Sequence, residues 1–155
     1  MKKIFIGIEI ISAMLILSLT AAAQPRVALV IGNAAYEKSP LTNPAKDAKD
    51  MATELTRLGF RVIIITDADR RQMIQAIQEF GKGLHDGSVA LFYYSGHGMQ
   101  YHGNNYLIPL KTAIAGEADI EFETVDANRV LAQMATANSN GVNLVILDAC
   151  RDNPY

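Results

Sequence analysis

The sequence predicts an α/β fold in which a mostly parallel sheet is covered by helices on both faces. Four short apolar runs are typical of buried strands, and they alternate with segments of helical periodicity. None of the four runs shows the polar alternation of a strand with one face in water. Strands that alternate with helices in this way pair in parallel through right-handed crossovers. In such sheets, functional residues lie just beyond the carboxyl ends of the strands.

The first strand and the first helix are predicted between residues 26 and 59. The strand is Arg26 to Ile31, and a loop over 34–42 follows it. Asn43 is placed to cap the helix, and Pro44 occupies its first turn. Gly59 ends the helix. Apolar residues recur along it at helical spacing, namely Ala48, Met51, Ala52, Leu55 and Leu58.

A second strand and a second helix follow in the same order. The strand is Arg61 to Thr66, and Asp67 to Asp69 form a turn that can cap the helix. The helix ends at Asp86-Gly87, and the third strand is Val89 to Tyr94. One face of this helix is apolar, with Met73, Ile77, Phe80 and Leu84.

The remainder of the chain contains less regular signals and one further strand. A short extended piece is predicted at Tyr106 to Leu110, after a stretch containing Gly and Asn. Asp126 is placed to cap a third helix, Asn138 to Gly141 form a turn, and the fourth strand is Val142 to Leu147. The apolar positions of the third helix are Val130, Leu131 and Met134.

Two of the predicted strands end in residues that are suited to covalent catalysis. His97 follows the third strand, and Cys150, the one cysteine of the chain, follows the fourth. If these strands are neighbours, the two side chains meet at one edge of the sheet. An imidazole beside a thiol can accept its proton or stabilise the thiolate, which is the nucleophilic form.

Simpler interpretations exist for both residues. A lone cysteine is often an inert core residue, but Cys150 stands in a polar exit from its strand. His102 is an alternative base, although it lacks the position at a strand end. His97 and His102 do not have the spacing of a standard metal site, so no metal is expected.

Length, composition and charge limit the classes of protein to which the chain can belong. The chain has 155 residues, about half of them apolar, and a formal net charge of −2. This is enough for one globular domain with a core. A nucleic-acid partner is not expected, because such binding requires a basic face.

The N-terminus has the pattern of a secretory signal peptide over residues 1–23. Lys2 and Lys3 precede an apolar run, and Ala21 to Ala23 provide small residues before a cleavage point. We therefore expect a periplasmic or secreted protein whose domain covers 24–155. The alternative is an uncleaved membrane anchor at the N-terminus.

The chain resembles the caspase-like cysteine peptidases, the clan of caspases, metacaspases and paracaspases, from about Arg26 to Tyr155. The spacing between His97 and Cys150 fits the family spacing of about 50 residues. Four segments carry the resemblance in order, namely Ala28 to Asn33, Asn43 to Ala48, Tyr94 to Gly98 and Asp148 to Arg151. The resemblance implies a three-layer caspase-like sandwich.

The resemblance also implies the roles of individual residues. Cys150 would be the nucleophile and His97 the general base and acid, with the backbone N–H groups of Gly98 and Cys150 forming an oxyanion hole. Asp148 and Asp47 match acidic positions of the substrate pocket in metacaspases and paracaspases. The implied activity is endopeptidase cleavage of proteins or peptides after Arg or Lys.

The chain departs from the family pattern beyond Cys150, because Tyr155 is its last residue. The family continues there with a small-subunit segment that completes the pocket and supplies a dimer contact. We therefore expect a partial domain whose strand with Cys150 is an exposed edge, and which pairs with that segment or forms a homodimer. No cofactor is expected; calcium activation occurs among relatives, but no calcium-binding loop is evident. The alternatives are a non-catalytic binding module, an inactive truncated fragment, and a thiol-dependent acyl hydrolase of another kind.

Overall fold

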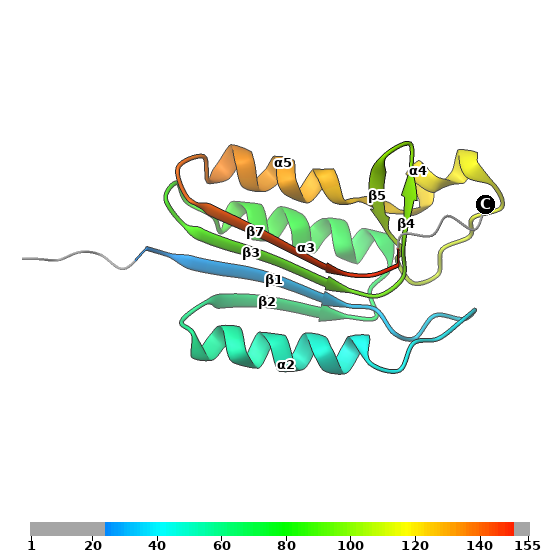
Figure 1. The fold of residues 1–155 in the computed structure, drawn as a ribbon, viewed down its shortest axis with the longest axis horizontal. Coiled ribbons are helices and arrows are strands. Elements are labelled where there is room, and N and C mark those ends of the chain that lie inside the picture. Colours follow the sequence, from blue (N-terminus) through cyan, green and yellow to red (C-terminus); the bar gives the residue numbers. More distant parts are fainter. Residues whose placement is uncertain (1–23, 151–155) are drawn as a thin grey trace, which may run out of the picture.

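The computed structural model describes residues 24–150, and its centre is a four-stranded sheet (Figure 1). The strands are β1 (Arg26–Gly32), β2 (Arg61–Thr66), β3 (Val89–Ser95) and β7 (Val142–Asp148). They lie in the order β2-β1-β3-β7, and every neighbouring pair is parallel. The four predicted strands are confirmed, and all four carboxyl ends lie at one edge of the sheet.

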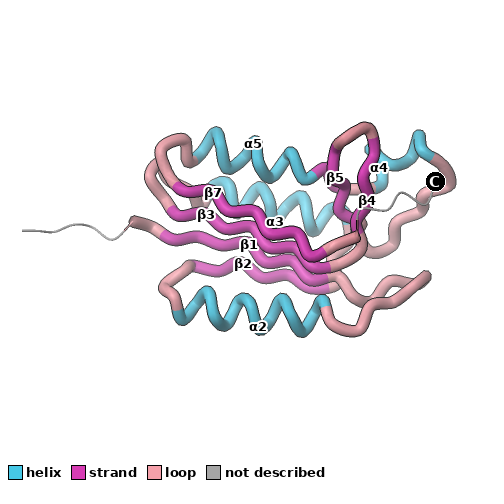
Figure 2. The backbone as a smooth tube through the Cα atoms, viewed as in Figure 1, coloured by secondary structure: helices cyan, strands magenta, loops and turns pink. Residues whose placement is uncertain are grey.

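Helices cover the sheet from both sides, which gives the predicted three layers (Figure 2). Helix α2 (Pro44–Arg57) lies on one face, and α3 (Arg70–Lys82) and α5 (Ala127–Ala137) lie on the other. Strand β1 has its side chains buried on both faces from Val27 onward. This explains why it is a continuous apolar run rather than an alternating one.

The core is divided in two by the sheet. On the α2 side, Ala28 and Val30 of β1 meet Leu91 and Tyr93 of β3 beneath the apolar face of the helix. The larger half lies on the side of α3 and α5. It contains Val27, Leu29, Ile31, Met73, Ile77, Phe80, Phe92, Tyr94, Val130 and Met134.

The helix ends agree with the sequence in three places and differ in two. One difference is the end of the second helix, because α3 ends at Lys82 with Gly83 as its C-cap and not at the predicted Asp86-Gly87. Asp69 and Gln72 form a reciprocal capping box at the start of α3. Asp126 accepts a hydrogen bond from the Asn128 N–H at the start of α5. Gly59 follows α2 with φ of 82°. The predicted cap by Asn43 is wrong, because its side chain makes no capping hydrogen bond and Pro44 alone marks the first turn.

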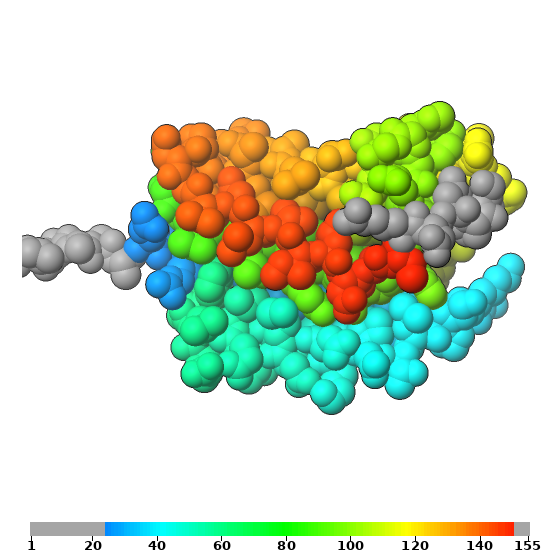
Figure 3. Space-filling model, in the orientation of Figure 1, coloured from blue at the N-terminus to red at the C-terminus, as the bar shows by residue number. Residues whose placement is uncertain are grey.

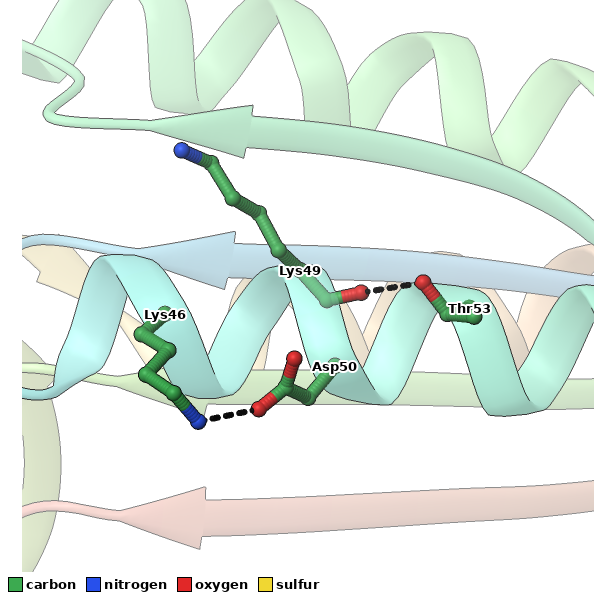
Figure 4. Close-up of polar contacts among 4 residues, drawn as sticks. All are labelled: Lys46, Lys49, Asp50 and Thr53. Atoms are coloured by element: carbon green, nitrogen blue, oxygen red, sulfur yellow. Dashed lines mark hydrogen bonds and ion pairs between the residues drawn. The ribbon is translucent and has the colours of Figure 1, made fainter.

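The outward face of α2 is polar. Lys46 Nζ lies 2.6 Å from Asp50 Oδ2, one helical turn along, and the Thr53 hydroxyl donates to the Lys49 carbonyl (Figure 4). Both ends of the ion pair are exposed, so water screens it and it contributes little to stability.

A small antiparallel sheet that the sequence did not predict follows β3. It consists of β4 (Gly98–Tyr101), β5 (Asn104–Leu107) and β6 (Val125–Asp126). His102 and Gly103 form the two-residue turn between β4 and β5, with φ of 47° and 79°. The predicted extended piece is thus displaced toward the N-terminus. The linker to β6 contains the short helices η1 (Glu117–Asp119) and α4 (Ile120–Glu123).

Strand β7 is an edge of the sheet in the described part of the chain, and one of its faces is open. Helix α2 lies over β1, β2 and β3, so the β7 side chains on that side are uncovered. They are Val142, Leu144 and Ile146, which are 50%, 44% and 42% exposed. Figure 3 shows β7, in orange-red, at the surface. The expected exposed edge is therefore observed over residues 24–150.

The predicted signal peptide, residues 1–23, lies outside the described residues, as do residues 151–155. In the part that the structure describes, no helix combines the length and apolar character needed to cross a membrane.

Candidate active site

The ends of β3 and β7 bring the two predicted catalytic segments side by side. Ser95 pairs with Asp148 at the last position of the register, and the Gly96 N–H donates to the Asp148 carbonyl at 3.3 Å. A Cβ atom added to Gly98 would lie 3.0 Å from the Cys150 carbonyl oxygen. The segment with His97 and the segment with Cys150 are thus neighbours at the carboxyl edge of the sheet.

Cys150 is exposed, and its thiol forms no disulfide. It lies beyond the last residue of β7, beside a narrow hollow that is also lined by Gly98, Leu107 and Ala149. An accessible cysteine in this position is not a core residue, so the packing interpretation of Cys150 does not apply.

The ring of His97 is fixed by two contacts from the loop after β1. Its Nε2 lies 2.7 Å from the Ser39 carbonyl oxygen, and its ring centroid lies 4.4 Å from that of Tyr36. A carbonyl oxygen can only accept, so the hydrogen of a neutral imidazole must be on Nε2. The Nδ1 lone pair is then the one that can accept a proton from a neighbouring thiol.

Two tyrosine hydroxyls hold the backbone of His97. The His97 N–H donates to Tyr36 Oη at 3.0 Å, and the Tyr94 hydroxyl donates to the His97 carbonyl at 2.7 Å. Burial raises the pKa of Tyr36 and raises that of Tyr94 well above its usual value. Both hydroxyls therefore remain protonated at neutral pH and can donate.

The backbone N–H of Gly98, one of the two predicted oxyanion donors, points away from the neighbouring strand. The Ile108 N–H donates to the His97 carbonyl, and Gly98 is paired with Leu107. In an antiparallel ladder this makes Gly98 and Leu107 a non-hydrogen-bonded pair, so the Gly98 N–H points away from β5. Cys150 lies beyond its strand and adjoins Gly98.

The predicted pocket acids lie on the α2 side of the same sheet edge. Ser95 Oγ donates to Asp148 Oδ2 at 3.2 Å. Burial raises the pKa of Tyr93, a hydrogen bond with Ser95 opposes the rise, and the charges of Asp148 and Asp47 add to it. The two carboxylates therefore act on the same tyrosine. No ion pair involving either of them is present within residues 24–150.

Close packing of α2 against β1 determines where Asp47 lies. A Cβ atom at Gly32 would overlap the Pro44 carbonyl and the Ala48 side chain. The absence of a side chain at Gly32 lets the first turn of α2 approach the end of β1. Asp47, in that turn, is consequently half-buried near the sheet edge rather than free in solvent.

The remaining histidines have surroundings of a different kind. His102 is exposed in the β4–β5 turn, where its ring stands edge-on to Tyr101 at 4.0 Å. His85 is exposed before β3. Over the described residues, no group of three or more His, Cys, Asp or Glu side chains is arranged to hold a metal ion.

Sequence reasoning missed three contributors to this site. No sequence pattern assigned a role to Tyr36, Tyr94 or Ser39. The Ser39 contact uses a backbone carbonyl, so no side-chain pattern could have revealed it. The hydroxyls of Tyr36 and Tyr94 meet across 58 residues of sequence, and a strand pattern does not encode such a contact.

Comparison with known proteins places all but the first residue of the described region in one family. A model of the caspase domain matches residues 25–155. The human mucosa-associated lymphoid tissue lymphoma translocation protein 1 and its mouse homologue are each 30% identical to the chain over 130 residues. The alignment covers 83% of this chain, and the chain spans about 15% of the length of these relatives.

A solved structure shows the same fold. The crystal structure of protein GSU0716 from Geobacter sulfurreducens matches with a TM-score of 0.64 at 23% identity. The match covers 81% of this chain and 51% of that one. At this identity the likeness concerns the fold alone, and it supports the three-layer architecture.

Proposed function

The chain belongs to the caspase-domain family of cysteine peptidases, and on this premise we propose that it is an endopeptidase with Cys150 as nucleophile. His97 is the general base and then the general acid in this proposal. The observation that carries it is the hydrogen bond from His97 Nε2 to the Ser39 carbonyl, at the strand end adjoining Cys150. It leaves Nδ1 as the nitrogen that accepts the thiol proton.

The proposed reaction has two steps. The Cys150 sulfur attacks the scissile carbonyl carbon, and the amide breaks to give a thioester while the leaving amine receives the proton from His97. Water, deprotonated by His97, then attacks the thioester, releases the acid and restores the thiol. The N–H groups of Gly98 and Cys150 stabilise the oxyanion, and each such donor is typically worth about 3 kcal/mol of barrier.

The proposed substrate is a protein or peptide with Arg or Lys before the scissile bond. Asp47 and Asp148 support this specificity, because both lie at the carboxyl edge and both act on Tyr93. A cationic side chain would compensate the two negative charges, whereas an acidic one would add to them.

A set of matched peptides tests the proposal. Fluorogenic peptides that differ only in Arg, Lys, Asp or Gln before the scissile bond are incubated with the purified chain and with its Cys150→Ala variant. We expect cleavage of the Arg and Lys peptides, and none by the variant. Cleavage of the Asp peptide alone would contradict the specificity, and cleavage of small esters without peptides would indicate a different acyl hydrolase. No turnover by a folded chain would favour a binding module.

We also propose that the chain is exported and that its reaction requires no cofactor. The apolar segment and alanines before Gln24 support export. Mass spectrometry of the protein from a bacterial periplasmic extract should find Gln24 as its first residue; an intact N-terminus would favour the membrane anchor.

The proposal that no cofactor is required is tested with a chelator. Peptide cleavage that persists in excess EDTA would support metal independence, and loss of cleavage would contradict it.

A further inference from the structure

We propose that Tyr36 and Tyr94 are positioning residues that clamp the backbone of His97 and thereby place its imidazole for the reaction. This inference rests on the proposed function of His97. Neither tyrosine is proposed to touch substrate, and each acts through His97. They come from different parts of the fold, since Tyr94 belongs to β3 and Tyr36 to the loop after β1.

The hydrogen bonds of the clamp involve both backbone groups of His97. Tyr36 Oη accepts from the His97 N–H at 3.0 Å, and the Tyr94 hydroxyl donates to the His97 carbonyl at 2.7 Å. The Ile108 carbonyl lies 2.9 Å from Tyr36 Oη and 3.0 Å from Tyr94 Oη. The two hydroxyls are 3.2 Å apart. The peptide groups on either side of the His97 Cα atom are therefore both held.

The distances favour an assignment of the hydroxyl protons that satisfies every group. Each hydroxyl has a single proton, and two carbonyls, those of His97 and Ile108, face the pair. Tyr94 donates to the nearer carbonyl, that of His97, and Tyr36 donates to that of Ile108. Tyr36 Oη then uses a lone pair for the His97 N–H. Removal of either hydroxyl leaves a backbone group of His97 without one partner, in a part-buried site.

Gly96 provides the space that the clamp needs. A Cβ atom at this position would lie 2.7 Å from Tyr94 Oη and 2.8 Å from Tyr36 Oη. Real Cβ atoms do not approach oxygen so closely, so any side chain at Gly96 would displace one of the hydroxyls. The glycine before the histidine is thus explained by the tyrosines beneath it.

The clamp is anchored in the rigid core. Tyr94 is fully buried, and Asn33, also fully buried, donates to the Ile108 carbonyl at 3.3 Å and to the Ala68 carbonyl at 3.2 Å. Asn33 Oδ1 accepts from the Ala68 N–H at 2.9 Å. These contacts fix the position of His97 relative to strand β1 and the start of α3, rather than relative to a loop in solvent.

The variants Tyr36→Phe and Tyr94→Phe test the inference, because each removes one oxygen and preserves the ring. Cleavage of the Arg peptide is measured as kcat and KM, with Tyr101→Phe as the control, since Tyr101 is half-buried on the hairpin away from the clamp. Melting temperatures are measured in parallel. We expect each clamp variant to lose about tenfold in kcat with KM within about twofold, and the control to be unchanged.

Amide hydrogen exchange gives a readout that does not depend on turnover. In folded Tyr36→Phe the His97 N–H should exchange about tenfold faster than in wild type, with no comparable change in core amides of β1. Unchanged kcat and unchanged exchange at His97, in folded Tyr36→Phe and Tyr94→Phe, would overturn the inference. Absence of cleavage by wild type would instead contradict the proposed function, and hydrogen exchange would then decide on the clamp. If Tyr94→Phe fails to fold, Tyr36→Phe decides.

Discussion

At the scale of single residues, the site combines one half-buried side chain that is held by two ring contacts with one that is exposed. The imidazole of His97 is fixed by Ser39 and Tyr36 and its backbone by Tyr36 and Tyr94, whereas Cys150 lies open beyond its strand. A preorganised base with a defined tautomer costs no reorganisation during proton transfer. In the proposed reaction, substrate reaches Cys150 from solvent.

Replacement of Asp148 by Asn should change specificity more than it changes catalysis. Asp148 is exposed, so the loss of its charge should lower kcat/KM for the Arg peptide by only about tenfold. Activity toward the matched Gln peptide should stay within about twofold, because that substrate presents no charge to the pocket. Equal losses on both peptides would show that Asp148 acts on the dyad or the fold instead. Glu54→Gln, on the exposed part of α2, is the matched control.

At the scale of secondary-structure elements, strong local signals predicted the helices and strands of the main sheet. The apolar runs of β1, β2, β3 and β7 and the capping residues Asp69 and Asp126 were sufficient to locate them. The small sheet was missed because β4 and β5 have four residues each and β6 has two. Such short strands are defined by pairing with one another, which a linear pattern does not contain.

The two helix N-termini give a matched prediction for stability. Asp69→Ala removes a side chain that accepts from the Gln72 N–H, so we expect it to lower the free energy of unfolding by about 1 kcal/mol. Asn43→Ala removes a side chain that makes no capping bond, and we expect a change below about 0.5 kcal/mol. Urea denaturation monitored by circular dichroism measures both. A larger loss from Asn43→Ala than from Asp69→Ala would contradict this account of the helix termini.

At the scale of the whole molecule, the sheet is covered unevenly. Helices α3 and α5 cover one face, whereas α2 alone lies on the other and does not extend over β7. The sequence does not show that one face of β7 is uncovered. Leu144 and Ile146 stand in an apolar run and look like core residues. The composition of the run predicted the strand, and only the placement of α2 determines which residues are buried.

The neighbouring residues Leu91 and Leu144 test this difference directly. They are paired in the β3–β7 register and are 6% and 44% exposed. Leu91→Ala should cost about 2–5 kcal/mol of unfolding free energy, because it leaves a cavity beneath α2. Leu144→Ala should cost less than about 1 kcal/mol and should reduce self-association, as followed by light scattering. Similar losses for the two variants would mean that the open face of β7 is covered in solution.

The family and the sheet could be predicted from the sequence, but the geometry of the site could not. His97, Gly98, Cys150, Asp47 and Asp148 were all expected at one edge, and the structure brings them to that edge. The groups that orient His97 are a loop carbonyl, the distant Tyr36 hydroxyl and the Tyr94 hydroxyl three residues away. Their contacts depend on how the loop after β1 folds back over β3, which follows from tertiary packing rather than from any local pattern.

The central claim is that His97 activates Cys150 for attack on a substrate with a basic residue. The most direct measurement is mass spectrometry of the purified chain after exposure to an arginyl acyloxymethyl ketone, with His97→Ala and Tyr101→Phe treated in parallel. We expect a single adduct on Cys150 in wild type and Tyr101→Phe, formed far more slowly in His97→Ala. No adduct in a folded wild-type sample, or equal rates in wild type and His97→Ala, would contradict the claim.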